Sequence, residues 1–159
     1  MAKTGKVFTN IGLAQASDFP IVVRNIKEGK SGTFLRGAPV LFAGGYLDEC
    51  GASPTSLFGF ANQAGSDTAA DGTNTLQILK AIPGVEFSGT LNTTSLAQTM
   101  QGVVMALVLS STTWVLATTS ATSDGQCLIT GWDSTWSEGD DYPVVNFTVV
   151  PEMIQVDQV

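Results

Sequence analysis

The chain has 159 residues, a formal net charge of −7 at pH 7 and a hydrophobic fraction of 43%. These values predict one domain with a sizeable core and exclude a disordered chain. Only 13% of the residues are charged, against about 25% in an average soluble domain. We therefore expect a surface of hydroxyl, amide and glycine groups, as on exposed β-sheets and on proteins that pack against other proteins.

Basic side chains are concentrated at the start of the chain. Residues 1–36 carry a formal charge of +4, whereas residues 37–159 carry −11. An acidic body repels phosphate, so no nucleic-acid partner is expected. The basic start is typical of a segment that contacts an acidic partner; the alternative is that these side chains only keep the start of the chain in solution. The candidate contact residues are Lys3, Lys6, Arg24, Lys27, Lys30 and Arg36.

Short apolar or alternating runs bounded by Gly, Pro, Asn, Asp and Ser recur along the chain, and helical periodicity is almost absent. This pattern predicts an all-β fold, either a small β-barrel or a β-sandwich. Residues 1–18 carry no sustained pattern and are expected to form an extended N-terminal arm before a single β-rich domain over residues 19–159. The predicted strands, in chain order, are Ile21–Ile26, Phe34–Arg36, Val40–Ala43, Tyr46–Glu49, Leu57–Asn62, Leu76–Ala81, Glu86–Leu91, Val103–Leu109, Trp114–Thr118, Cys127–Trp132 and Val144–Val150.

The segments between these strands predict two hairpins and one helical turn. Gly44-Gly45 is a two-residue hairpin loop in which both positions tolerate a positive φ, and residues 110–113 are expected to connect the strands of a second hairpin. A single helical turn is expected at Leu96–Gln101, with Thr94 or Ser95 as its N-cap.

Other segments predict exposure or burial. Val103–Leu109 lacks alternation, so both faces of this strand should be covered and it should lie at the centre of the core. Gly65–Asn74 and Thr118–Gly125 are small, polar and glycine-containing, which predicts exposed loop tips. Apolar residues alternate in Glu152–Val159, so this end of the chain is expected to pack on the body.

Several classes of chemistry have no support in the sequence. The chain has no histidine, which removes the commonest general base and metal ligand and excludes Ser-His-Asp and Cys-His catalysis. No phosphate-binding glycine motif is present, and we expect no cofactor and no metal. Cys50 and Cys127 are expected to be buried thiols, with a disulfide as the minority interpretation. A hydrolase using a pair of carboxylates stays the enzyme alternative.

No apolar run reaches the roughly 18–20 residues of a membrane span, so no membrane partner is expected. The N-terminus lacks the apolar segment of a signal peptide. Synthesis in the cytosol is therefore expected.

The densest acidic segment, WDSTWSEGDDY, combines Asp133, Glu138, Asp140 and Asp141 with three aromatic residues. Its carboxylates could hold Ca²⁺, but the spacing does not match an EF-hand loop, and we interpret the segment as a solvated loop between two strands. Its aromatic residues could stack on sugars or bases, close a barrel end or lie in an interface, where aromatic residues are enriched. They are Trp132, Trp136 and Tyr142.

One ordered set of motifs is similar to a known family. Residues 37–67 read GAPVLFAGGYLDECGASPTSLFGFANQAGSD: Gly-x-Pro-Val entering a strand, a hairpin, and Leu-Phe-Gly-Phe-Ala running into a polar loop. Thr-rich strands follow, with WVLATT from Trp114, LITGWD from Leu128 and VVNFTVV from Val144. Over residues 33–150 this order resembles the capsid decoration, or cement, proteins of tailed bacteriophages. The chain differs from the simplest members in its longer basic N-terminal region and extra C-terminal strands.

The resemblance implies a structural virion protein without a catalytic site. Such a protein binds the outside of an icosahedral capsid and clamps neighbouring capsomers. Its partners would be the major capsid protein and itself, as a homotrimer. Its place would be the capsid exterior, after synthesis in the host cytoplasm. The alternatives are a phage tail or fibre component, or a receptor- or carbohydrate-binding β module that uses the loop from Trp132 to Tyr142.

Overall fold

The computed structural model of the protein describes residues 9–14, 21–25, 30–51, 54–67, 74–117 and 125–155. These residues form an all-β structure without a helix of seven or more residues, which confirms the predicted fold class. Two short 3-10 turns, η1 (Gln98–Met100) and η2 (Pro151–Met153), accompany the strands. The strands are β1 (Gly12–Leu13), β2 (Ile21–Asn25), β3 (Lys30–Phe34), β4 (Pro39–Ala43), β5 (Tyr46–Glu49), β6 (Gly59–Ala61), β7 (Gly65–Asp67), β8 (Thr75–Lys80), β9 (Glu86–Asn92), β10 (Val104–Ser110), β11 (Thr113–Ala117), β12 (Cys127–Gly131) and β13 (Val144–Val149).

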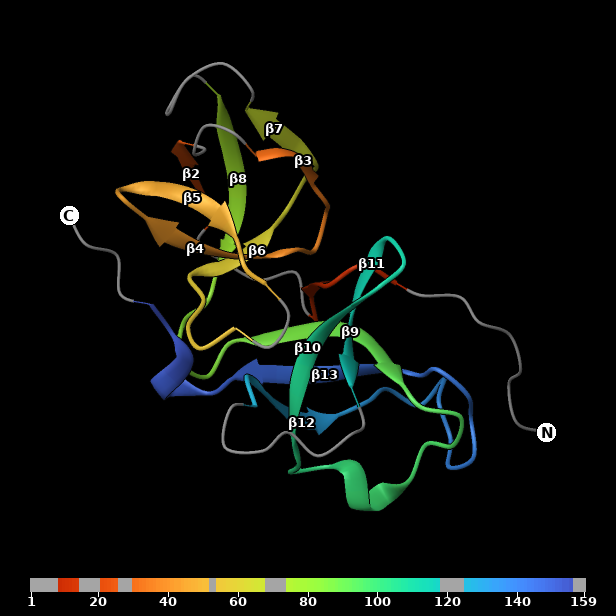
Figure 1. Ribbon diagram of the computed structural model, residues 1–159. Coiled ribbons are helices and arrows are strands. Elements are labelled where there is room, and N and C mark those ends of the chain that lie inside the picture. The colour runs from red at the N-terminus through yellow and green to blue at the C-terminus, as the bar shows by residue number, and fades with distance from the viewer. Residues whose placement is uncertain are drawn as a thin grey trace.

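The C-terminal half of the chain forms a closed five-stranded β-barrel. Its strands pair in the order β9-β11-β10-β12-β13, and β13 pairs with β9 to close the ring. Every pair is antiparallel except β9 with β11, where Leu116 lies beside Leu91 in a parallel register. The short strand β1 pairs with β9 as well, through Gly12 and Leu13. Figure 1 shows this barrel in the lower part of the molecule.

The N-terminal half forms a second, half-barrel sheet above it (Figure 1). Its order is β2-β8-β6-β4-β5, with all neighbours antiparallel. Gly44 and Gly45 connect β4 to β5 with φ angles of 63° and 86°. Two positive φ angles are the signature of a type I′ turn, whose twist matches that of the flanking strands. The predicted Gly-Gly hairpin is therefore confirmed.

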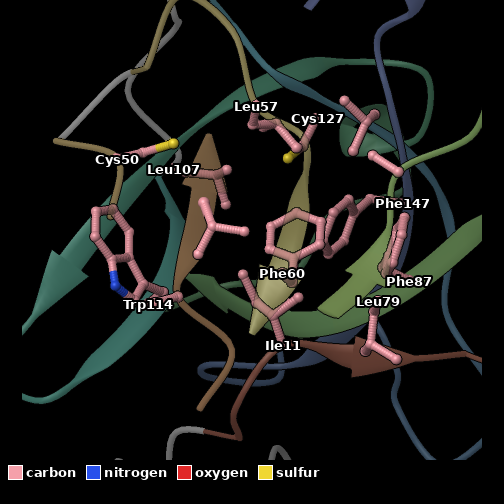
Figure 2. Close-up of a cluster of buried hydrophobic side chains, with 14 of the residues drawn as sticks. Ile11, Cys50, Leu57, Phe60, Leu79, Phe87, Leu107, Trp114, Cys127 and Phe147 are labelled. Carbon is pink, nitrogen blue, oxygen red and sulfur yellow. The ribbon is translucent and has the colours of Figure 1, made fainter. Parts of the chain in front are cut away.

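The two sheets share one hydrophobic core. The ring of Phe60 in β6 contacts both Phe87 of β9 and Phe147 of β13, at centroid distances of 4.8 and 5.9 Å. All three rings are fully buried, and Figure 2 shows them at the centre of the cluster. Gly59, beside Phe60, is packed so closely that an added Cβ atom would overlap the carbonyl oxygen of Leu79 in β8. The barrel and the half-barrel are therefore held together by side chains from both halves of the chain.

The predicted arm over residues 1–18 is described at residues 9–14. This part is extended and lies against the barrel: Ile11 is only 2% exposed and belongs to the shared core. The amide of Thr9 donates a hydrogen bond to Thr90 Oγ1 at 2.8 Å. The remaining positions of the predicted arm lie outside the described residues.

Each predicted strand overlaps an observed one, but two strands, β1 and β7, were not expected. β7 falls in Gly65–Asn74, which was predicted to be an exposed loop tip; that prediction is wrong at residues 65–67, because they pair with β3. Of the second predicted loop tip, residues 118–124 lie outside the described residues. The predicted helical turn occurs as η1, but its N-cap is Ala97 with no side-chain cap, rather than Thr94 or Ser95.

The strand predicted to be buried on both faces is only partly so. Met105 and Leu107 lie in the shared core, whereas Val103, Val104 and Leu109 are 37%, 36% and 45% exposed. The expectation was wrong for these three residues, because an apolar run does not reveal which of its residues another element covers. β10 is nevertheless internal to the barrel, between β11 and β12.

The end of the described chain packs on the half-barrel, which confirms the expectation for Glu152–Val159 as far as Gln155. Ile154 pairs with Leu57 in a parallel bridge. The Gln155 side chain accepts a hydrogen bond from the Phe42 amide at 2.6 Å and donates one to the Phe42 carbonyl at 3.2 Å. It thereby pairs with the backbone of β4 as a neighbouring strand would.

Candidate functional site

The structure describes three of the six basic residues predicted to contact a partner. Arg24 lies on β2, Lys30 is the first residue of β3, and Arg36 lies in the turn between β3 and β4. All three belong to the half-barrel part of the chain. Lys3, Lys6 and Lys27 lie outside the described residues.

The Arg24 side chain packs over the ring of Phe58. Its side chain is half-buried, and its guanidinium carbon lies 5.9 Å from the centre of the Phe58 ring. The ammonium group of Lys80 lies 5.4 Å from the centre of the same ring. Cations over an aromatic face are held by the ring quadrupole, so Arg24 has a structural role in addition to any contact with a partner. No local pattern in the sequence shows that Lys80 lies beside Arg24, because the two residues are 56 positions apart and contact the same ring only in the fold.

Arg36 is exposed and lies beside the N-terminal segment. Its neighbour Gly37 has a φ of 83°, and a Cβ atom there would lie 2.7 Å from the backbone nitrogen of Ile11. Only glycine fits this close approach. The described start of the chain therefore passes over the turn that carries Arg36.

The aromatic and acidic loop between β12 and β13 forms hydrogen bonds with residues 93–98. The amides of Gly139 and Tyr142 donate to the carbonyls of Leu96 and Thr93 at 2.8 and 2.7 Å. The amide of Gln98 donates to the Glu138 carboxylate at 2.9 Å. These bonds join segments some 40 residues apart, and they hold the loop as a rigid part of the barrel.

The interpretation of this loop as solvated is wrong at Asp140. Its side chain is only 3% exposed, and its Oδ2 accepts a hydrogen bond from the Ser137 amide at 2.9 Å. Its carbonyl accepts another from the Leu96 amide at 2.9 Å. A buried carboxylate requires such a donor, and the bond from Leu96 fixes the backbone of Asp140 to a segment that is distant in sequence. Asp133, Ser134 and Glu138 in the same loop are exposed, as expected.

The three predicted aromatic residues are all half-buried, but they do not act as one surface. Trp132 and Trp136 pack against the hydrophobic core. Of the three, only Trp132 lines a hollow on the outside of the barrel. This hollow has a volume of about 330 Å³, and its lining residues are Glu86, Gln98, Gln101, Thr130, Gly131, Trp132 and Asn146.

The polar residues of this hollow were not singled out in the sequence. Glu86, Thr130 and Asn146 lie on β9, β12 and β13, on the opposite face to the core residues Phe87, Ile129 and Phe147. Strand alternation marks them as outward-facing, but no local signal shows that the three strands are neighbours. Only the pairing of β13 with both β9 and β12 brings them together.

The two cysteines are buried free thiols, as expected. Burial raises the pKa of Cys50 to about 12, with further contributions from the charges of Asp48 and Glu49. Burial also raises the pKa of Cys127 well above its usual value. Both thiols therefore stay protonated at neutral pH, and neither has the thiolate character of a reactive cysteine.

Comparison of the chain with known protein families, with curated proteins and with solved structures finds no match. In the ranges that the structure describes, no group of three or more Cys, Asp or Glu side chains is arranged to hold a metal ion. No helix in the same ranges has the length and apolar character needed to cross a membrane.

Proposed function

We propose that the protein is a structural virion protein that binds the outer surface of an icosahedral phage capsid and clamps neighbouring capsomers. Its partner is the major capsid protein, it associates with itself as a homotrimer, and it works without a catalytic site. The observation that carries the proposal is the ordered stretch over residues 37–67, which resembles capsid decoration proteins. Its described residues form β4, the Gly-Gly turn, β5 and β6 of the half-barrel, and β7, which pairs with β3.

The surface of the protein supports an assembly role. Val103 precedes β10, and Val104 and Leu109 lie near the two ends of this strand; all three expose apolar side chains. Few charges are available to keep this surface away from other proteins, and a surface of this composition favours packing against another protein. The charge distribution is the second argument for an assembly role. Residues 1–36 carry +4 and the rest of the chain −11, which favours docking of the basic start on an acidic partner.

The mechanism of capsid stabilisation is thermodynamic linkage. A clip that binds only the assembled shell stabilises that shell by the free energy of its own binding. At 100 times the dissociation constant, this amounts to about 2.7 kcal/mol per site. Repeated over every site of a capsid, the effect raises its resistance to heat and to the pressure of packaged DNA.

The deciding experiment uses DNA-filled capsids that lack the protein. Purified protein is added, bound protein is measured by co-sedimentation, and the melting of the shell is followed by the access of a DNA dye during heating. Decorated capsids should melt at a higher temperature. Equal melting of bare and decorated capsids, or no co-sedimentation, would reject the proposal and favour a tail, fibre or receptor-binding role.

The basic start is tested with a variant in which Lys3, Lys6, Lys27 and Lys30 are changed to Ser. We expect weaker attachment and a smaller salt dependence, because exposed charge contacts are screened within about 8 Å at physiological ionic strength and about 3 Å at 1 M salt. The matched control changes the same four lysines to Arg, which keeps the charge at every position and should bind as the parent does. Unchanged attachment of the four-site variant across the salt series would show that the start of the chain plays no part in docking.

A further inference from the structure

The basic and acidic side chains of this protein are unequally divided between the two halves of the chain. All seven Lys and Arg residues lie in residues 1–80, together with six carboxylates, which gives a net charge of +1. Residues 81–159, which form β9 to β13, contain no Lys, Arg or His and eight carboxylates, which gives −8. A cation that pairs with an acidic group of the barrel strands must therefore come from residues 1–80 or from another molecule.

The hollow beside Trp132 is a polar recess that offers hydrogen-bond acceptors. Of the described residues that line it, only Glu86 is charged. Gln98 Nε2 donates to Gln101 Oε1 at 2.7 Å, and Gln101 Nε2 donates to the Thr130 carbonyl at 2.8 Å. This chain of bonds runs in one direction, so Gln98, at its beginning, keeps its side-chain oxygen as an acceptor. A carboxylate and an amide oxygen favour a group that donates hydrogen bonds and carries a positive charge.

A second carboxylate lies next to this recess. Glu138 accepts a hydrogen bond from the backbone amide of Gln98 at 2.9 Å, and Gln98 lines the hollow. The negative charges of Glu86 and Glu138 add at the recess, so the local potential repels an anion and attracts a cation.

Exposed apolar side chains follow the hollow along the chain. Val103 and Val104 come shortly after Gln101, which lines the hollow, and they are 37% and 36% exposed. The amide of Val103 donates to the Met100 carbonyl at 3.2 Å, which ties these valines to η1. A polar recess next to exposed apolar side chains is typical of a surface that contacts another protein.

Arg36 is the described basic residue best suited to enter such a recess. Arg24 and Lys80 are both held over the Phe58 ring, whereas the Arg36 side chain is exposed in the turn between β3 and β4. A guanidinium group can donate two parallel hydrogen bonds to one carboxylate and further bonds to an amide oxygen. The hollow has a volume of about 330 Å³, within the range that accommodates whole small molecules, so one guanidinium group fits in it.

Arg36 and the hollow belong to opposite ends of the molecule. The turn that carries Arg36 is part of the half-barrel side, whereas the segment around η1 closes the hollow. Figure 1 shows the half-barrel at the top and η1 at the bottom, with the barrel strands between them. Arg36 therefore reaches this hollow only in another copy of the chain. A contact between two different surfaces of identical chains is a head-to-tail interface, the kind from which a three-fold ring is built.

We propose that the protein self-associates head to tail, with Arg36 of one copy in the hollow of the next copy and paired there with Glu86. The exposed side chains of Val103 and Val104 border this contact. This interface rests on the homotrimer of the proposed function and specifies how its subunits meet. It does not depend on the capsid: a protein that never bound a capsid could still associate in this way.

The test measures self-association of the free, full-length chain by sedimentation velocity over a series of concentrations. Arg36→Glu and Glu86→Arg should each weaken association about tenfold or more, because each puts two like charges together at the interface. The variant with both changes restores a pair of opposite charges and should associate as the parent does. Arg36→Gln and Glu86→Gln should weaken association several-fold, and they keep the test open if circular dichroism shows that a charge reversal prevents folding.

Glu152→Arg is the matched control, because it makes the same charge change at an exposed position that does not line the hollow, and it should associate as the parent does. A monomeric parent, or a double variant that associates no better than the single variants, would overturn the proposal. So would single variants that associate normally but lose capsid attachment, because the hollow would then face the capsid. A parent that associates as expected but does not bind capsids would reject the proposed function alone.

Discussion

Replacing Phe60 by Ala tests whether the barrel and the half-barrel are one cooperative unit. Phe60 is fully buried, and its ring contacts Phe87 and Phe147 at centroid distances of 4.8 and 5.9 Å (Figure 2). It belongs to β6 of the half-barrel, whereas both partners belong to the barrel. The substitution therefore removes the central contact between the two sheets without changing any hydrogen bond of the strands.

The expected loss is large compared with the stability of a domain. A buried Phe→Ala exchange costs about 3–5 kcal/mol, out of a total of about 5–15 kcal/mol. In a domain of this size each kcal/mol corresponds to about 2–4 °C, so the melting temperature should fall by about 6–20 °C. A milder variant, Phe60→Leu, should lose about 1–2 kcal/mol and keeps the test open if the alanine variant does not fold.

The assay is urea unfolding followed by two signals. All three tryptophans lie in the C-terminal half, at positions 114, 132 and 136, so their fluorescence follows the unfolding of the part of the chain that forms the barrel. Far-ultraviolet circular dichroism reports on both sheets. If the core is shared, the change at Phe60 must shift the tryptophan transition as much as the dichroism transition, although no tryptophan lies in the half-barrel.

Two results would refute this reasoning. The first is a tryptophan transition that stays at its parental urea concentration while the dichroism transition moves, which would mean that the two sheets unfold independently. The second is an additive double-mutant cycle between Phe60→Ala and Phe87→Ala, because rings in contact should couple by about 0.5–1.5 kcal/mol.

Three further predictions concern the backbone and the buried thiols. Gly59→Ala should lower the free energy of unfolding by about 2–3 kcal/mol or more, because its Cβ atom would overlap a carbonyl oxygen of β8. The control Gly51→Ala meets no atom within 4 Å and should change the free energy of unfolding by less than about 0.5 kcal/mol. Similar urea midpoints for the two variants would contradict this prediction. Ser111 has a φ of 59° in the two-residue turn between β10 and β11, so Ser111→Gly should raise stability by about 0.5–1 kcal/mol, and a lower melting temperature would be the opposite result. Burial raises the pKa of Cys50 to about 12 and that of Cys127 well above 9.0, so the unfolded thiols lose their protons from about pH 9 upward while the folded ones keep theirs. The free energy of unfolding should then fall by about 1 kcal/mol per thiol between pH 9 and pH 10. Urea titrations at the two pH values measure this fall. A variant with both cysteines changed to Ala should lose correspondingly less stability between the two pH values.

Local patterns in the sequence were enough to place most strands and one turn. Period-two alternation and short apolar runs predicted the strands of the barrel and of the half-barrel, because each side chain's direction follows from the pleat of its own strand. Gly44-Gly45 predicted the β4–β5 hairpin, because only residues that tolerate positive φ angles fit both positions of that turn. The burial of Cys50 and Cys127 likewise followed from residue type, because a free cysteine behaves as a small hydrophobic side chain.

Tertiary structure alone decided which strands became neighbours, and with them the candidate binding site. The parallel pairing of β9 with β11, the closure of the ring by β13 and the contact of Phe60 with both join residues far apart in the chain. No local pattern carries this information, because the hydrogen-bonding groups of one strand edge can pair with many others. Asp140 is an example: its sequence environment is that of a solvated loop, yet its side chain is buried and its backbone carbonyl accepts a hydrogen bond from the amide of Leu96, 44 positions earlier. The same long-range pairing brings Glu86, Thr130 and Asn146 from three neighbouring strands to one hollow, because a barrel closes only when distant strands satisfy each other's backbone groups.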